Sequence, residues 1–160
     1  MGIKNSRDFD LLTLGQLLLR LSPPDNERLS RGDTFVKQVG GAELNVAVGA
    51  ALLGLHTGVI SKLPAHDIGS FMKGKIRSFG VSDDFFMYDQ SSSARVGIYY
   101  YENGAYPRKP KVIYDRNNSS FFSLNIDEIP EEVYTASKCF HTTGITLALN
   151  EKIRETTIEM

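Results

Sequence analysis

The fold of this 160-residue chain is decided at residues 40–54, which read GGAELNVAVGAALLG. The two leading glycines lack a Cβ, so the backbone there can approach a ligand closely. A helix of small residues starts directly after Gly41, and the N–H groups of its first turn have no intrahelical partner. Glu43 and Asn45 add polar side chains to the same turn. The pattern predicts a binding surface for a polyhydroxylated ligand, although tight packing of a helix on a sheet gives similar sequences.

The segments around this helix predict an α/β fold with a mostly parallel sheet flanked by helices. Apolar runs with little alternation are typical of strands buried on both faces. The expected strands are Phe9–Leu14, Leu17–Leu21, Gly58–Leu63, Phe85–Tyr88 and Lys138–Thr142. Gly54 closes the first helix, Asp67 is a candidate cap for a second that stops at Gly80, and Asn150 caps a final one. Strand and helix therefore alternate along the chain.

Two segments have a different pattern and predict a separate small antiparallel sheet. Arg95–Tyr101 and Lys111–Arg116 alternate with period two, and Arg28–Val39 is a further candidate strand region. The loop around Asn103 is too long for a two-residue hairpin. Such a sheet, standing over the carboxyl ends of the parallel strands, would form a lid on the ligand crevice.

Several motifs resemble the ribokinase-like (pfkB) sugar kinases. Residues 40–54 resemble the first signature of that family, Gly-Gly-Ala-x-x-Asn-x-Ala followed by a glycine. The segment Lys62–Gly69, KLPAHDIG, resembles the one that follows it, with Pro64 where the general signature has glycine. Both this segment and Leu19–Pro24, LRLSPP, are similar to the 2-keto-3-deoxygluconate kinase branch. The resemblance covers nearly the whole chain, from about Phe9 to Ile158.

The resemblance implies that residues 1–160 are the N-terminal part of one ribokinase-like domain, with lid segments at about 20–39 and 94–123. It implies a kinase that uses ATP and Mg²⁺ to phosphorylate 2-keto-3-deoxygluconate or a similar ketosugar acid. A homodimer formed through the β-lid is the partner expected besides the small-molecule substrate. A neutral-sugar kinase of the ribokinase or fructokinase type, and a non-catalytic sugar-acid binding or subunit-interaction module, stay open as alternatives.

The resemblance also assigns substrate-binding residues. Those in the matching positions are Gly41, Asn45, Tyr99, Tyr114, Arg116 and Ile145, with Gly40 and Gly15 in support. A tyrosine hydroxyl beside a guanidinium can hold a carboxylate, and Tyr114 and Arg116 share one face of their strand. The alternative for these two residues is an ordinary amphipathic strand with solvated charges. Gln16 stands where the family more often has glutamate, so its role is left open.

The catalytic machinery is expected outside these residues. The family carries its catalytic aspartate and anion hole in a Gly-Ala-Gly-Asp segment, where backbone N–H groups stabilise the transferring phosphate. No such segment occurs here. The last expected helix reaches Met160 without a capping glycine, so the chain is expected to be cut in mid-fold. We therefore expect no catalytic residue here, no strong binding of ATP or Mg²⁺, and no activity from these residues alone.

Composition and charge argue against several kinds of partner, location and metal site. A formal net charge of −1 argues against nucleic acid as a partner. No apolar run is long enough to span a membrane and the N-terminus has no signal-peptide pattern, so a cytoplasmic protein without membrane contact is expected. The single cysteine, Cys139, cannot form an internal disulfide and is expected to be buried. The three histidines lack metal-ligand spacing; His66 is expected near a helix cap and His141 as a hydrogen-bonded core residue.

Overall fold

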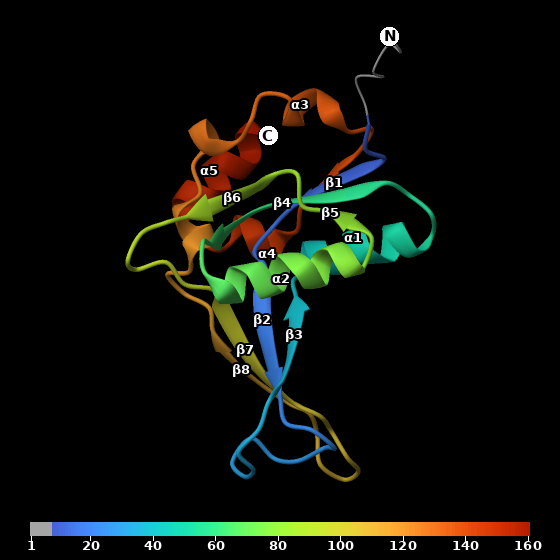
Figure 1. Ribbon diagram of the computed structural model, residues 1–160, viewed down its shortest axis with the longest axis vertical. Coiled ribbons are helices and arrows are strands. Elements are labelled where there is room, and N and C mark those ends of the chain that lie inside the picture. Colours follow the sequence, from blue (N-terminus) through green and yellow to red (C-terminus); the bar gives the residue numbers. More distant parts are fainter. Residues whose placement is uncertain (1–7) are drawn as a thin grey trace.

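The computed structural model describes residues 8–160, and residues 1–7, which hold most of the polar N-terminal segment, lie outside it. The described chain forms two sheets (Figure 1). The first, which we call the body sheet, has strand order β5-β4-β1-β9, with β6 also pairing with β4. All of its pairings are parallel. Its strands are β1 (Leu11–Leu14), β4 (Thr57–Pro64), β5 (Val81–Ser82), β6 (Phe86–Asp89) and β9 (Phe140–His141).

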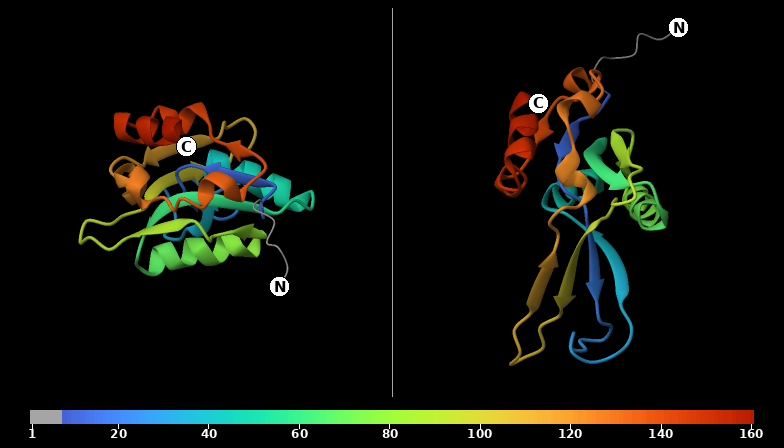
Figure 2. Two further views of the ribbon diagram at one scale, coloured as in Figure 1. Left: turned by 90° about the horizontal axis from the view of Figure 1, so that it is seen from above. Right: turned by 90° about the vertical axis from the view of Figure 1, so that its left-hand side faces the viewer.

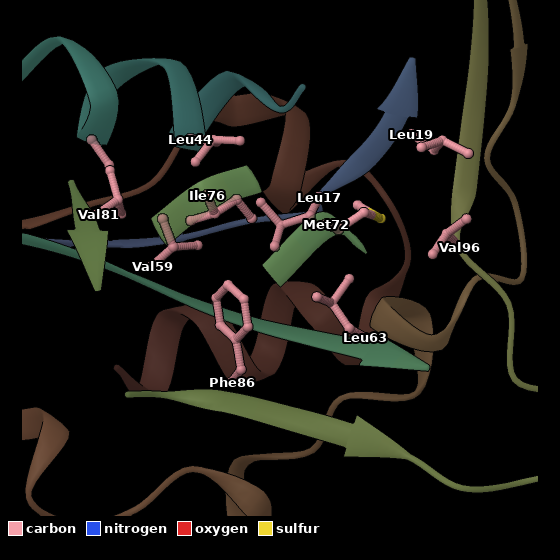
Figure 3. Packing of buried hydrophobic residues seen from close by; sticks show 11 residues of the cluster. Leu17, Leu19, Leu44, Val59, Leu63, Met72, Ile76, Val81, Phe86 and Val96 are labelled. Carbon is pink, nitrogen blue, oxygen red and sulfur yellow. The ribbon is translucent and has the colours of Figure 1, made fainter. Parts of the chain in front are cut away.

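Helices cover both faces of the body sheet and enclose two hydrophobic clusters. The helices α1 (Ala42–Leu52) and α2 (Asp67–Ser78) pack on one face, where Leu44, Val59 and Met72 belong to the first cluster (Figure 3). The opposite face carries α5 and the segments before it, and Figure 2 shows the two layers on either side of the sheet. Its elements are η1 (Ser120–Ser123), η2 (Ile126–Glu128), α3 (Val133–Ala136) and α5 (Glu151–Glu159), and α4 (Gly144–Leu147) lies between α5 and the first turn of α1. The predicted α/β fold with a mostly parallel sheet is confirmed.

The central strand and the two long helices follow the sequence signals closely. Every residue of β4 is buried, as expected for a parallel strand covered on both faces. Helix α1 ends before Gly54, whose φ of 89° is readily adopted only by glycine. Helix α2 is capped by the side chain of His66, which accepts a hydrogen bond from the Ile68 N–H at 3.2 Å. Asp67, the expected cap, is the first helical residue instead.

The second sheet, which we call the lid sheet, has strand order β3-β2-β7-β8 and projects away from the body (Figures 1 and 2). Its strands are β2 (Leu18–Ser22), β3 (Val36–Gly40), β7 (Gly97–Glu102) and β8 (Lys111–Asp115). The sheet is mixed rather than antiparallel, because β2 runs parallel to β7 and antiparallel to β3. The bounds expected for the two lid segments, about 20–39 and 94–123, stay a prediction.

Two expectations from apolar sequence runs are wrong in detail. Leu17–Leu21 does not supply a body strand: the chain leaves β1 at Gly15 and enters the lid sheet as β2, where Arg20 and Leu21 are only half-buried. The expected strand Lys138–Thr142 shortens to the two residues of β9, which lies at the end of the sheet and, within the described residues 8–160, pairs with β1 alone. Because the strand lies at that edge, Cys139 is exposed rather than buried.

Within residues 8–160, no helix combines the length and the apolar character needed to cross a membrane.

Candidate functional site

A pocket of about 330 Å³ lies where the first turn of α1 meets the lid sheet. The structure brings all six predicted substrate-binding residues to its wall: Gly41, Asn45, Tyr99, Tyr114, Arg116 and Ile145. They come from four separate elements or the residues next to them: α1, β7, β8 and α4. We call this cavity the site pocket. The sequence motifs therefore converge on one place, and the role of each residue there stays a prediction.

The floor of the site pocket is the N-terminus of α1. Gly41 is the N-cap and has a φ of 155°, and a Cβ at this position would come within 2.8 Å of the Gln16 carbonyl oxygen. The first intrahelical bond runs from the Asn45 N–H to the Gly41 carbonyl at 3.0 Å. The N–H groups before Asn45 therefore have no acceptor within the helix, and they carry the positive end of its dipole. This surface suits an oxygen-rich or anionic ligand.

The predicted supporting glycines lie directly behind this floor. A Cβ at Gly40 would come within 2.5 Å of the Tyr99 hydroxyl, and a Cβ at Gly15 would overlap the Glu43 carboxylate. Each glycine thus makes room for a polar side chain that lines the site pocket. Larger residues at these two positions would displace Tyr99 or Glu43.

The wall of the site pocket is the inner face of the lid sheet. Tyr99 and Tyr114 lie opposite each other in the β7–β8 register, with ring centroids 5.9 Å apart. Arg116 follows two residues later, and its guanidinium carbon is 5.7 Å from the centre of the Tyr114 ring. Burial raises the pKa of the Tyr99 hydroxyl, which therefore stays a hydrogen-bond donor to high pH. Burial lowers the pKa of Arg116, and the nearby Tyr114 and Glu43 oppose that shift.

Gln16, whose role the sequence left open, is hydrogen-bonded to Arg116. Its amide oxygen accepts a bond from the Arg116 Nε at 2.8 Å, and its amide nitrogen donates to the Arg116 carbonyl at 3.1 Å. The same nitrogen donates to the Ser119 hydroxyl at 2.7 Å. The side chain is only 3% exposed, and it joins residues a hundred positions apart.

Glu43 joins α1 to the segment that carries Ile145. One of its carboxylate oxygens accepts bonds from the Thr143 N–H at 3.2 Å, the Thr143 hydroxyl at 2.5 Å and the Thr146 hydroxyl at 2.7 Å. Glu43 is 2% exposed, whereas Ile145 is 50% exposed. This buried carboxylate therefore fixes α4 against the first turn of α1. The sequence placed Glu43 in the turn but gave no sign of these partners.

Arg20 and Tyr101 also line the site pocket, and the sequence analysis missed them. Arg20 lies opposite Tyr99 in the β2–β7 register, and its guanidinium carbon is 4.3 Å from the centre of the Tyr101 ring. Its Nε donates to the Ser22 hydroxyl at 2.9 Å. The signal was present, because Leu18, Arg20 and Ser22 share one face of β2. The expectation that Leu17–Leu21 forms a buried parallel strand hid this polar face of β2.

The histidines that the sequence analysis considered do not line the site pocket. His66 acts as the helix cap described above. His141 is half-buried, but its Nε2 finds no hydrogen-bond partner among residues 8–160, so the expectation of a hydrogen-bonded core histidine is wrong. Among residues 8–160, no group of three or more histidine, cysteine, aspartate and glutamate side chains could hold a metal ion.

Comparisons with known proteins agree on one family. The model of the pfkB family carbohydrate kinases matches residues 8–160. The chain is 38% identical over 151 residues to a 2-dehydro-3-deoxygalactonokinase of Haloferax volcanii, covering 94% of the chain and 46% of that protein. It is 32% identical to 5-dehydro-2-deoxygluconokinase 1 of Bacillus cereus, covering 91% of the chain and 43% of that protein.

Solved structures give the same result. The crystal structure of 2-dehydro-3-deoxygluconokinase from Thermotoga maritima superimposes with a TM-score of 0.88 at 35% identity, covering 94% of this chain and 46% of that one. A putative 2-keto-3-deoxygluconate kinase from Enterococcus faecalis superimposes with a TM-score of 0.87 at 26% identity. The chain spans a little under half the length of the curated relatives named here. It belongs to the pfkB family of carbohydrate kinases.

Proposed function

We propose that the protein carrying these residues phosphorylates a 2-keto-3-deoxy sugar acid, 2-keto-3-deoxygluconate or a close isomer. Residues 8–160 supply the sugar site and the lid. The γ-phosphoryl group of ATP passes to the primary hydroxyl of the sugar, with Mg²⁺ neutralising charge on the phosphates. The catalytic base, the ATP pocket and the metal site lie in other residues of the protein. A cytoplasmic location follows for an enzyme that uses ATP.

The observation that carries this proposal is the environment of Arg116. Its guanidinium lines the site pocket beside two tyrosines. None of the ion pairs within the described chain involves it. The Glu43 carboxylate lies near enough to favour its charged form but makes no ion pair with it, so the terminal N–H groups of the guanidinium are left for an anion that a ligand supplies. A carboxylate matches the planar fork of arginine, and the hydroxyls of Tyr99 and Tyr114 can donate to the same group.

The floor of the site pocket suits the rest of such a ligand. Asn45 offers both an amide donor and an acceptor to sugar hydroxyls, and the N–H groups of the first α1 turn offer further donors. Ile145 adds a half-exposed apolar side chain to the lining, and we expect its backbone to contact the ligand. The carboxylate end of the sugar would thus lie at the lid, and its hydroxyls at the body.

The test is a phosphorylation assay on the longest natural protein that contains these residues. Candidate acceptors are 2-keto-3-deoxygluconate, 2-keto-3-deoxygalactonate, 5-dehydro-2-deoxygluconate, fructose and ribose, each with ATP and Mg²⁺. We expect the highest kcat/KM with one of the 2-keto-3-deoxy acids. A preference for fructose or ribose would establish the neutral-sugar alternative instead.

A non-catalytic binding module is the second function to test. Calorimetry with 2-keto-3-deoxygluconate, with and without ATP, separates the two proposals. Sugar-acid binding that never leads to product, in the longest natural protein, would favour the module. Turnover would exclude it.

We also propose that the lid sheet forms a homodimer with a second lid sheet. Support comes from the exposed apolar side chains on and beside its edge strands, Phe35 and Val36 at β3 and Val112 and Ile113 on β8. Edge strands that expose such residues favour association. Light scattering should give a dimer mass, and charged substitutions at Val36 and Ile113 should give the monomer mass with the fold retained.

A further inference from the structure

We infer that Arg20 is a second binding residue for the acid end of the ligand, and that it supplies the positive charge by which the site pocket selects an acid over a neutral sugar. This inference rests on the proposed binding of a sugar acid in the site pocket. It adds a cation on β2, on the other side of the two lid tyrosines from Arg116. The ligand carboxylate then lies between two guanidinium groups.

The charged side chains that line the site pocket leave an excess of positive charge. Of the residues that the structure describes, the charged ones in its wall are Arg20, Arg116 and Glu43. The Glu43 carboxylate favours the charged form of Arg116, so these two opposite charges largely offset each other for an approaching ligand. None of the ion pairs among residues 8–160 involves Arg20. The positive charge that remains to attract an anion is therefore that of Arg20.

Arg20 lies on the same face of the lid sheet as the predicted ligand-binding residues. It is opposite Tyr99 in the β2–β7 register, and Tyr99 is opposite Tyr114 in the β7–β8 register. These three side chains form one row across neighbouring strands, with about 4.8 Å from strand to strand. Arg116 lies beyond the other end of this row, two residues after Tyr114 and on the same face. A carboxylate that accepts from the two tyrosine hydroxyls thus has a guanidinium on either side.

The Arg20 side chain is held in place by neutral partners. Its Nε donates to the hydroxyl of the buried Ser22 at 2.9 Å, and its guanidinium carbon lies 4.3 Å from the centre of the Tyr101 ring. Burial raises the pKa of the Tyr99 hydroxyl, and the nearby charge of Arg20 opposes that rise, because the guanidinium lies close to this hydroxyl. The terminal nitrogens form a planar fork that suits a carboxylate. A guanidinium that is already ordered loses little freedom when it binds an anion.

A purely structural role for Arg20 in the lid is the alternative to test. Arg20 also lines a neighbouring cavity of about 480 Å³, together with Asp25 and Asn103. Asp25 is exposed, and it forms no ion pair with Arg20 in the part of the chain that the structure describes. If Arg20 only stabilised the lid beside Asp25, Arg20→Met and Asp25→Asn would lower the melting temperature alike and leave ligand affinities unchanged.

The decisive experiment compares two ligands that differ only at the end that Arg20 would contact. One is 2-keto-3-deoxygluconate, and the other is 3-deoxyfructose, which has a hydroxymethyl group in place of the carboxylate. Binding of both is measured by calorimetry in the longest natural protein that contains these residues. The variants are Arg20→Met, Arg20→Lys, Arg116→Ala and Asp25→Asn. Arg28→Met is the charge control, because Arg28 is an exposed arginine between β2 and β3 that does not line the site pocket.

We expect Arg20→Met to weaken binding of the acid by about tenfold and to leave the affinity for 3-deoxyfructose within about twofold. Arg20→Lys keeps the charge but loses the planar fork, so a smaller loss, about threefold for the acid, is expected. Arg28→Met should leave both affinities unchanged, and Asp25→Asn should not weaken binding of the acid. Melting curves show whether each variant folds, and Arg20→Lys keeps the test valid if Arg20→Met does not.

The contrary results separate the inference from the proposed function. If the wild-type protein does not prefer the acid, the proposed acid site is wrong and the role of Arg20 is wrong with it. If the wild-type protein prefers the acid but Arg20→Met keeps the wild-type ratio of acid to neutral affinity, the acid site stands and only the role of Arg20 is wrong. Equal losses for both ligands would make Arg20 a structural residue alone. If Arg20→Met removes the preference and Arg116→Ala does not, Arg20 binds the acid and the assignment of the carboxylate to Arg116 is wrong.

Discussion

The body sheet and the lid sheet contribute to the same pocket in opposite ways. Strand β4 of the body is buried along its whole length, whereas every residue of β8 in the lid is exposed. The body supplies backbone groups and short polar side chains at the start of α1, and the lid supplies long aromatic and cationic side chains. A buried, close-packed body holds its groups in place, while a thinly covered sheet can present large side chains to a ligand.

The largest expected effect is a difference in stability: truncating a buried isoleucine of the body sheet should cost far more than truncating an exposed one of the lid sheet. Ile60 on β4 is fully buried, and Ile113 on β8 is 44% exposed. Ile60→Ala should lower the free energy of unfolding by about 2–5 kcal/mol, because it opens a cavity in a packed core. In the monomer, at protein concentrations too low for two lid sheets to pair, Ile113→Ala should cost less than about 1 kcal/mol. Denaturant titrations of the two variants measure both values. A large loss for Ile113→Ala would show that the lid sheet is covered, as the proposed homodimer requires.

Arg116→Ala should have the next largest effect, and on binding rather than on stability. We expect sugar-acid affinity to fall by about 1.5–3 kcal/mol, the range for a hydrogen bond to a charged group, while a neutral sugar is barely affected. Arg95→Ala is the matched control, because Arg95 lies outside the site pocket and pairs with Asp115 at 2.9 Å. Equal losses for both ligands would mean that the change has damaged the lid instead.

Glu43 tests whether the body can position the ligand without contacting its carboxylate. Glu43→Ala leaves the buried Thr146 hydroxyl without its acceptor and should cost about 1–3 kcal/mol of stability. Because Glu43 holds α4, which carries Ile145, affinity for a neutral sugar should fall, and affinity for the acid should fall less, since the change also removes a negative charge near Arg116 and the ligand carboxylate. Glu43→Gln keeps an acceptor of the same shape and should restore most of both. Calorimetry with the two ligands and melting curves will decide, and a loss confined to the acid would contradict this assignment.

The sequence was sufficient where one local signal agrees with the final packing. The glycine pair before α1, the buried run of β4 and the glycine stops of α1 and α2 each depend on residues close in the chain. The resemblance then brought Tyr99, Tyr114 and Arg116 together with Asn45, which alternation alone could not do. The mixed pairing of β2 with β7 joins residues about eighty positions apart, and no local pattern encodes it.

The sequence failed where a residue's role depends on a distant partner. Gln16 looked like a departure from a motif until its bonds to Arg116 were known. Arg20 belongs to a run whose leucines suggested a buried strand, although the opposite face of that strand meets the site pocket. Free cysteines are usually buried, which suggested that Cys139 is buried, yet it is exposed beside the edge strand. In each case the surroundings of the residue were inferred from the nearby sequence, whereas the topology of the fold determines them.

The smallest expected effect lies inside the body, at helix α2. Apart from its chain neighbours and the backbone of its own helix, no atom of residues 8–160 lies within 4 Å of where a Cβ of Gly74 would be, so Gly74→Ala should raise stability by about 0.5–1 kcal/mol through the better helix propensity of alanine. Gly69 in the same helix is the control, because its Cβ would meet the Pro64 carbonyl oxygen. Gly69→Ala should therefore destabilise the protein despite the same gain in propensity. Denaturant midpoints of the two variants are the measurement. A loss in both would mean that close packing extends over all of α2, and the contrast between a tight body and an open lid would then be sharper than the present structure indicates.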